Sequence, residues 1–148
     1  MSVSLDGFVA GPDQSRDNPL GIGGLKLHHW HLDEPPYHAP VFVLTHHPHD
    51  PIEMEGGTTF HFVTQGFAAA FERASAVAGE LGVDIAGGAS TVRQALAAGV
   101  IDELMLDFVP VLLGSGERLF DGVPDPGFEP VEVIPSPQAT HVRYRVRR

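Results

Sequence analysis

The 148-residue chain contains no cysteine. This absence excludes a disulfide scaffold, a thiolate metal site and a cysteine nucleophile. Basic residues are scarce as well: nine Lys and Arg stand against nineteen Asp and Glu, for a formal net charge of −10 with neutral histidines. A charge of that sign repels a phosphate backbone, so we expect no nucleic-acid partner. The single basic cluster lies at the C-terminus and consists of Arg143, Arg145, Arg147 and Arg148.

Long apolar runs are also missing. No stretch approaches the roughly 20 residues that span a bilayer, and residues 1–7 lack the basic region and apolar stretch of a signal peptide. We therefore expect a cytoplasmic protein with no membrane partner. The residues that are present form an ordinary globular mixture, 43% apolar and 19% charged, and the length suits one domain with a buried core.

Segments rich in apolar residues predict the secondary structure. Residues 3–10 alternate weakly and predict a short strand that ends in a turn, while residues 25–32 could form two helical turns. Continuous β-branched and aromatic runs at 40–45 and 58–64 predict strands buried on both faces, with a polar loop between them. Further strands are predicted at 83–86, 102–113, 128–134 and 139–146, and helices at 66–81 and from Ser90 or Thr91 to Gly99.

The order of these elements predicts the fold. Strands that alternate with helices indicate an α/β fold with right-handed crossovers and a mostly parallel sheet. The last two strands predict an antiparallel C-terminal hairpin at a sheet edge. In the second helix, Thr91 and Gln94 fit a capping box, and Gly99 fits a C-terminal glycine. We find no repeat and no linker, so we expect a single domain over residues 1–148.

The most informative motif is the segment 85–91, in which Gly87 and Gly88 separate a predicted strand from a predicted helix. Unpaired N–H groups and the positive end of the helix dipole bind phosphate at such a helix N-terminus. Glycine lets the backbone approach an anion closely, and ligands of parallel sheets sit at the carboxyl ends of strands. A tight turn without a ligand explains the spacing equally well.

Other polar candidates have ordinary structural explanations. Asp6, at the end of the first strand, could orient a polar substrate, but a turn cap is the better interpretation. The glycine-rich loop 18–24 could cover a ligand or be only a loop, and Trp30 fits a core or interface anchor. Two histidine clusters, at 28–31 and 46–49, lack the spacing of known zinc motifs, so we expect no metal site. The chain has no G-x-S-x-G motif to support an α/β-hydrolase.

Four segments together resemble a known family. Residues 4–10 are similar to its opening S-x-D-G-x-[IV]-A, and residues 18–30 resemble N-x-x-G-I-G followed by L-x-W. Residues 87–91 are similar to a G-G-x-x-[TL] turn, and residues 102–114 to D-E-L followed by P-V-L-L-G. The chain thus resembles proteins of the dihydrofolate-reductase fold, in particular the bacterial branch related to the RibD C-terminal reductase domain of riboflavin biosynthesis.

This resemblance implies a three-layer fold, a homodimer and a reductase that uses NADPH on a pterin- or pyrimidine-like heterocycle. The cofactor supplies the hydride, and the protein supplies position and a dry pocket. A non-catalytic, nucleotide-binding dimer of the same fold is the alternative. The implied catalytic residues of the substrate pocket are Asp6 and Trp30. The implied cofactor contacts are Gly87, Gly88, Ala89, Ser90 and Thr91 for the pyrophosphate, Ala10, Gly21, Ile22 and Gly23 for the nicotinamide end, and Thr45 and His46 for the adenosine 2′-phosphate.

The chain departs from this family between Trp30 and the strand at 40–45. The family has a helix there and then a strand that ends in G-R-x-T, whereas residues 32–40 are too few for a crossover unit of on the order of 30 residues. Losing a central strand would leave backbone groups unpaired, so we expect that a segment between about residues 32 and 39 is omitted from this chain. No acidic side chain at 25–32 matches the proton donor for dihydrofolate, which disfavours true folate reduction.

Overall fold

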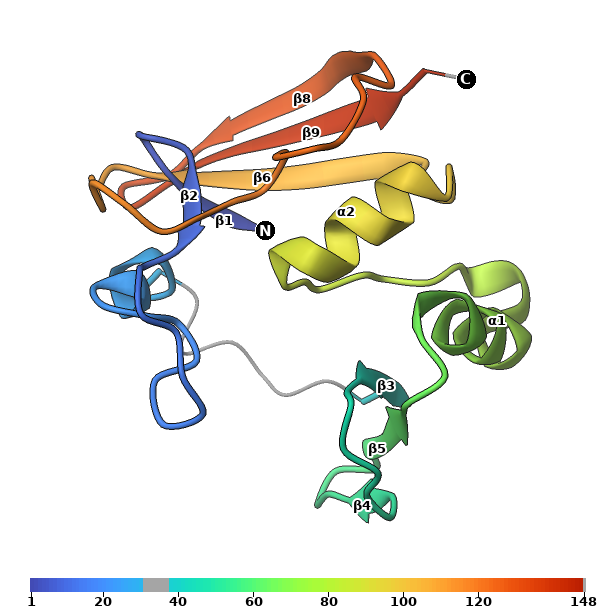
Figure 1. The fold of residues 1–148 in the computed structure, drawn as a ribbon. Helices are drawn as coiled ribbons and strands as arrows, with labels where there is room; N and C mark the ends of the chain where they lie inside the picture. Colours follow the sequence, from blue (N-terminus) through green and yellow to red (C-terminus); the bar gives the residue numbers. More distant parts are fainter. Residues whose placement is uncertain (31–37, 148) are drawn as a thin grey trace. The chain divides into compact units, whose positions relative to one another are not determined.

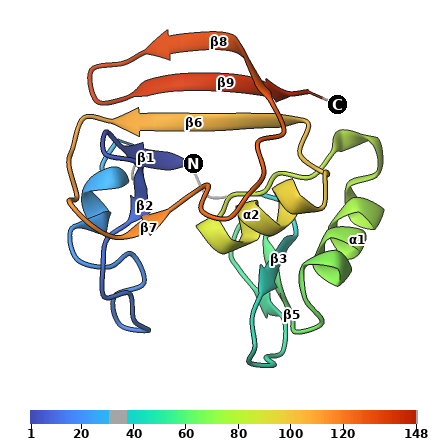
Figure 2. The same ribbon diagram turned by 45° about the horizontal axis from the view of Figure 1, so that its top comes forward.

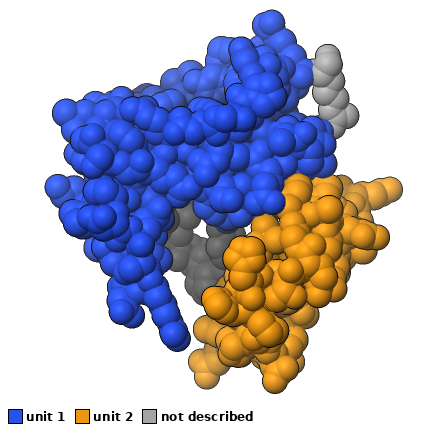
Figure 3. Space-filling view, viewed as in Figure 1, with its two compact units in different colours: residues 1–33, 86–148 blue, residues 34–85 orange. Residues whose placement is uncertain are grey.

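The computed structural model describes residues 1–30 and 38–147 and divides the chain into two compact units (Figure 3). Unit 1 comprises Met1–Asp33 and Ala86–Arg148, and unit 2 comprises Glu34–Ile85. The omission expected between residues 32 and 39 falls almost entirely outside the described residues. The prediction of one domain over the whole chain stays a prediction, and the two units are described in turn.

The main sheet of unit 1 has four strands in the order β1-β6-β9-β8 (Figures 1 and 2). Its first pair, β1 (Ser2–Ser4) and β6 (Glu103–Val109), is parallel. Two antiparallel pairs follow, first β6 with β9 (Thr140–Val146) and then β9 with β8 (Phe128–Pro135). The predicted α/β fold and the antiparallel hairpin at the C-terminal edge of the sheet are therefore confirmed.

A turn divides the first predicted strand into two. Residues 2–4 form β1, whereas β2 (Phe8–Ala10) pairs with the short strand β7 (Glu117–Arg118) in a separate sheet. The chain turns because Gly7 takes a φ of +87°, and because the Ser4 hydroxyl accepts the Phe8 N–H at 2.9 Å. The prediction of a single strand at 3–10 is wrong, since alternation alone does not register a glycine that reverses the chain.

Helix α2 (Ala89–Ala97) lies beside β6 (Figures 1 and 2) and contributes Val92, Ala95 and Leu96 to the buried core. The sheet contributes alternate residues, among them the facing pair Leu106 and Val142. A short 3-10 helix, η1 (Gly24–Leu27), replaces the two helical turns predicted at 25–32; Leu32 lies outside the described residues.

Two predictions around α2 are wrong. Residues 83–86 form no strand, because none of their backbone groups joins a ladder with the described parts of the chain. Thr91 does not cap the helix: α2 begins at Ala89 with Gly88 as its N-cap, so Thr91 and Gln94 sit one turn too late for a capping box. The C-terminal prediction holds, since Gly99 takes a φ of +67° and donates its N–H to the carbonyl of Leu96 at 3.0 Å.

Unit 2 contains a three-stranded sheet and a helix. Strand β3 (Val41–Leu44) runs parallel to β5 (Thr59–Val63), and β4 (Ile52–Glu53) pairs antiparallel with β5. Helix α1 (Phe67–Ala78), which continues into the 3-10 helix η2 (Gly79–Leu81), packs on β3. Sequence analysis predicts these elements closely but misses β4.

The predicted burial of β3 on both faces is wrong, because every residue of β3 is only half-buried. Unit 2 has one α-helix within residues 38–85, and one helix covers one face of a sheet. Across the described residues 1–30 and 38–147, no helix is long and apolar enough to cross a membrane.

Candidate functional site

No side chain caps the N-terminus of α2. Gly88, its N-cap residue, has no side chain, and the first hydrogen bond runs from Val92 N–H to the carbonyl of Gly88 at 3.1 Å. Within the part of the chain that the structure describes, the N–H groups of residues 89–91 donate to no acceptor. Unpaired N–H groups and the positive end of the helix dipole attract anions. This end of α2 therefore suits a phosphate group.

The two glycines before α2 differ in their surroundings. Gly87 has a φ of +134°, which residues with a side chain rarely adopt, and a Cβ there would lie 2.7 Å from the terminal methyl group of Met1, which would have to move. Gly88 has an ordinary φ of −69°, and a Cβ there would meet nothing within 4 Å. Gly87 is thus needed for the fold of the turn, while Gly88 leaves free space beside the helix terminus. The peptide bond that joins them is cis.

The hydroxyl residues predicted at this turn lie in the first turn of α2. Ser90 is exposed and Thr91 is half-buried. The Gln94 amide donates to the Ser90 carbonyl at 3.3 Å and to its hydroxyl at 3.4 Å. Gly87, Gly88 and Ser90 are therefore together at one helix end, as predicted, but the segment does not follow an assigned strand.

The glycine-rich loop folds back tightly on the end of β2. Gly11 N–H donates to Leu20 O, and Ile22 N–H donates to Pro12 O, each at 2.8 Å. A Cβ on Gly21 would overlap the Gly11 carbonyl. The structure therefore brings the predicted nicotinamide contacts Ala10, Gly21, Ile22 and Gly23 into one loop cluster. Its glycines are explained by close backbone packing, and Ala10 itself is buried.

Asp6 is held by the backbone of the segment that follows β6. Its carboxylate accepts the Ser4 hydroxyl at 2.6 Å, the Gly114 N–H at 2.7 Å and the Leu113 N–H at 3.2 Å. The Ser4 hydroxyl is the main cause that lowers the pKa of Asp6 to about 2, and the two N–H groups add to it against the opposing effect of desolvation. Asp6 is thus a carboxylate at neutral pH whose hydrogen bonds fix a turn.

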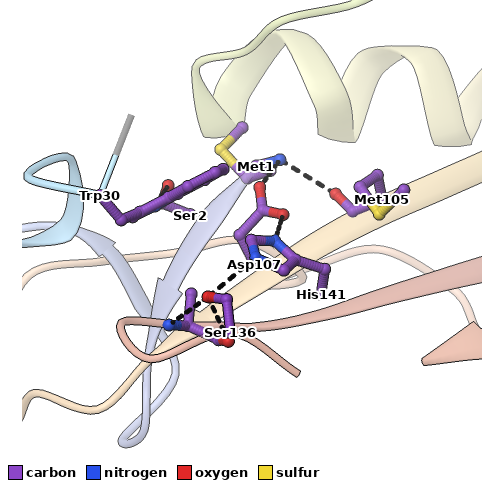
Figure 4. Close-up of polar contacts among 8 residues, drawn as sticks. Met1, Ser2, Trp30, Met105, Asp107, Ser136 and His141 are labelled. Carbon is purple, nitrogen blue, oxygen red and sulfur yellow. Dashed lines mark hydrogen bonds and ion pairs between the residues drawn. The ribbon is translucent and has the colours of Figure 1, made fainter. Parts of the chain in front are cut away.

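Trp30 lies in a polar cluster on unit 1 that Figure 4 shows in close-up. Its indole N–H donates to the Ser2 hydroxyl at 3.1 Å, and its ring contacts the His141 ring edge-on, with centroids 4.9 Å apart. His141 Nδ1 lies 2.8 Å from Asp107 Oδ1, and the Met1 amino group lies 3.2 Å from Asp107 Oδ2. Trp30 is therefore oriented by polar groups from β1 and β9.

The Asp107–His141 pair is the part of this cluster that sequence analysis misses. The two residues face each other in the register of β6 and β9, although 34 positions separate them. A signal was present, since Asp107 is the only charged residue in the apolar run 104–113. A lone carboxylate in a buried strand requires a partner. The sequence pattern thus predicts that Asp107 has a partner but does not identify it.

Thr45 and His46 follow β3 in unit 2. Thr45 N–H donates to Val63 O at 3.1 Å, and its hydroxyl accepts the His47 N–H at 3.1 Å. Their predicted contact with a 2′-phosphate stays a prediction. Among the described residues, no three or more His, Asp or Glu side chains gather as a set that could hold a metal ion.

These features define an α/β protein with a helix N-terminus that no side chain caps and a Trp–His–Asp cluster. Residues 23–142 match the family model of the RibD C-terminal domain, and the chain belongs to this family. The resemblance drawn from the four sequence motifs is thereby confirmed.

One of two similar solved structures supports this fold. A candidate riboflavin biosynthesis protein from Shewanella sp. PV-4 superposes with a TM-score of 0.62 at 20% identity, covering 100% of this chain and 97% of that one. A pyrimidine reductase-like protein from Corynebacterium diphtheriae gives a TM-score of 0.48 at 26% identity, covering 62% of this chain and 39% of that one. Comparison with curated proteins finds no match.

Proposed function

We propose that this chain is a reductase that binds NADPH and reduces a pterin- or pyrimidine-like heterocycle. The observation that carries the proposal is the uncapped N-terminus of α2, with free space beside Gly88, in a chain of the RibD C-terminal domain family. The fold supports the proposal, because a solved structure described as a candidate riboflavin biosynthesis protein superposes on the whole chain. A cytoplasmic location and a homodimer are part of the same proposal.

The residues at α2 fit a cofactor pyrophosphate. The N–H groups of Ala89, Ser90 and Thr91 are donors without acceptors among the described residues, and the Ser90 hydroxyl is exposed. Oxyanions form short, strong hydrogen bonds to such groups. When bound, the cofactor supplies a hydride, and the protein has to hold it and exclude water.

The remaining predicted residues receive roles within this proposal. Ala10 and residues 21–23 would form the wall next to the nicotinamide, while Thr45 and His46 would contact the 2′-phosphate. Asp6 shapes the wall rather than transferring a proton, because its carboxylate is saturated with hydrogen bonds and its pKa is about 2. Trp30 presents an aromatic surface on which a planar heterocycle can stack.

The test of cofactor binding is the substitution Gly88→Val. The isopropyl group enters the space that a phosphate needs, and Gly88 has a φ that valine can adopt. Losing even one charge-assisted hydrogen bond, worth about 1.5–3 kcal/mol, raises the Kd at least about tenfold. NADPH fluorescence titration measures this change, with thermal unfolding to show that the variant folds.

A matched control is Ala98→Val, which adds a valine at the exposed C-cap of the same helix. We expect its NADPH affinity to equal that of the wild type. Equal affinity in a folded Gly88→Val variant would remove α2 from the site. Absence of NADPH binding by the wild type would refute the reductase, and binding without turnover of a pterin and aminopyrimidine panel would establish the non-catalytic alternative.

A further inference from the structure

Hydrogen bonds connect the Asp107–His141 pair to Ser136 (Figure 4). Asp107 is 7% exposed and its Oδ1 lies 2.8 Å from His141 Nδ1. The other ring nitrogen, Nε2, lies 3.3 Å from the Ser136 hydroxyl, in the turn between β8 and β9. That hydroxyl also lies 2.9 Å from the Ala139 carbonyl and 3.0 Å from the Ala139 N–H.

The Ser136 hydroxyl has one proton and two groups that can accept it, the Ala139 carbonyl and His141 Nε2. When the proton goes to the Ala139 carbonyl, which also accepts the Ser136 N–H at 2.9 Å, the hydroxyl has only a lone pair left for His141 and Nε2 donates to it. Asp107, as a carboxylate, can only accept, so Nδ1 donates as well. In this arrangement His141 is an imidazolium ion beside a carboxylate, whereas a Ser136 proton donated to Nε2 leaves the ring neutral.

The groups that face His141 come from several elements. Asp107 supplies the negative charge from β6, and Ser136 and Trp30 present a lone pair and an aromatic ring. The Met1 amino group contacts the other oxygen of Asp107, not the histidine. Further along the same face, Arg143 is paired with Glu103 and Glu132 and so is neutralised.

The bond to Ser136 is the weakest of the network. At 3.3 Å it is longer than the 2.8 Å bond to Asp107, and hydrogen bonds weaken with length. A substrate atom with a lone pair can therefore replace Ser136 at Nε2 at little cost. Such an atom would belong to a molecule against Trp30, whose ring already contacts the histidine edge-on.

We propose that His141 donates, from Nε2, the proton that completes the reduction, and that Asp107 is the positioning residue that holds its ring and charge. This inference rests on the proposed function. When bound, the nicotinamide cofactor would supply a hydride for the carbon of a C=N or C=O bond of the substrate. The π electrons of that bond would move to the heteroatom, which would take the proton from His141 Nε2. His141 would be left as a neutral ring that keeps its Nδ1 proton, hydrogen-bonded to Asp107, and solvent would restore the proton at Nε2.

The first test needs no substrate. Long-range ¹H–¹⁵N spectra of the ¹⁵N-histidine protein at pH 6 report whether each ring nitrogen carries a proton, and His141→Gln assigns the signals. We expect the imidazolium pattern for His141 in the wild type, and a smaller protonated fraction at the same pH in the Asp107→Asn variant, which lacks the facing carboxylate. A neutral ring in the wild type at pH 6 overturns the proposal, whatever the activity.

The second test is kinetic and uses the heterocycle that the wild type turns over. We expect kcat to fall at least about tenfold, equivalent to 1.4 kcal/mol, in His141→Gln and Asp107→Asn, with the Kd for NADPH within twofold of the wild type. The wild-type kcat should decline with rising pH along the titration curve of His141 seen by NMR, and the His141→Gln profile should be flat. A merely structural role would not move this profile.

The control is Arg143→Gln, which breaks two ion pairs on the same face of β9 and should leave kcat unchanged. Full kcat in folded His141→Gln refutes the proton donor while the reductase stands. Loss of NADPH binding in the wild type refutes the proposed function instead, and the NMR result still decides the protonation of His141. A drop in Arg143→Gln as large as in His141→Gln marks general damage to the sheet and overturns the proposal.

Discussion

The substitution Leu27→Ala should be among the most costly in unit 1. Leu27 ends η1, is completely buried and packs with Val109 and Ala139 beneath Trp30. Truncation removes three carbon groups at about 0.8 kcal/mol each, or roughly 2.4 kcal/mol if the surroundings collapse onto the alanine. A cavity that stays open raises the loss towards about 5 kcal/mol. We therefore expect the free energy of unfolding to fall by about 2.4–5 kcal/mol.

Urea unfolding followed by tryptophan fluorescence measures this change directly, because Trp30 is the only tryptophan and contacts this cluster. The matched control is Leu25→Ala, in the same 3-10 helix but 53% exposed. Its cost should stay within about 0.5 kcal/mol. A loss below about 1 kcal/mol for Leu27→Ala, or equal losses for the two variants, would refute the packing argument. At about 2–4 °C per kcal/mol, the Tm of Leu27→Ala should fall by at least about 5 °C.

Two further predictions concern the turns around the candidate site. The pKa of Asp6 is lowered to about 2 from 3.8. The ionised Asp6 carboxylate therefore stabilises the folded state fully above the pKa of the unfolded chain, and this stabilisation is lost as the pH falls towards 2. The stability difference between wild type and Asp6→Asn should be constant above pH 5 and shrink between pH 4 and 2; a difference that persists at pH 2 would contradict the assignment. Gly116→Ala should be far more damaging than Gly122→Ala, because both have a positive φ but only a Cβ on Gly116 overlaps the Ala10 carbonyl. Thermal unfolding compares the two variants. For Gly122→Ala we expect a loss of about 1–2 kcal/mol in the free energy of unfolding from backbone strain alone. Similar Tm values for the two variants would contradict the overlap of the Gly116 Cβ with the Ala10 carbonyl.

Elements whose sequence pattern lies within a short stretch of the chain are predicted well. Helix α1 repeats apolar residues at spacings of three and four, and the hairpin of β8 and β9 surrounds a Pro-Ser-Pro turn, so both can be read from short windows. The motif at 87–91 predicts the glycine turn before α2 in the same way. The family resemblance also depends on residues that lie close in the sequence.

The parts that sequence reasoning misses depend on distant partners. Strand β7 has only two residues and forms because β2 pairs with it. Residues 83–86 have the composition of a strand but form none, because a strand needs a neighbour to hydrogen-bond. The Asp107–His141 pair requires the register of β6 against β9, which no local window contains.

Strand β8 has a consequence for how copies of the protein can meet. It forms the outer edge of the main sheet of unit 1, and an open edge invites another strand to add to it. Here Pro130 and Pro135 lack N–H donors, the ladder is irregular between Pro130 and Glu132, and Glu129 adds a charged side chain. The edge is thus protected against continuous β-sheet polymerisation, and the homodimer proposed above would have to associate through a surface other than this edge.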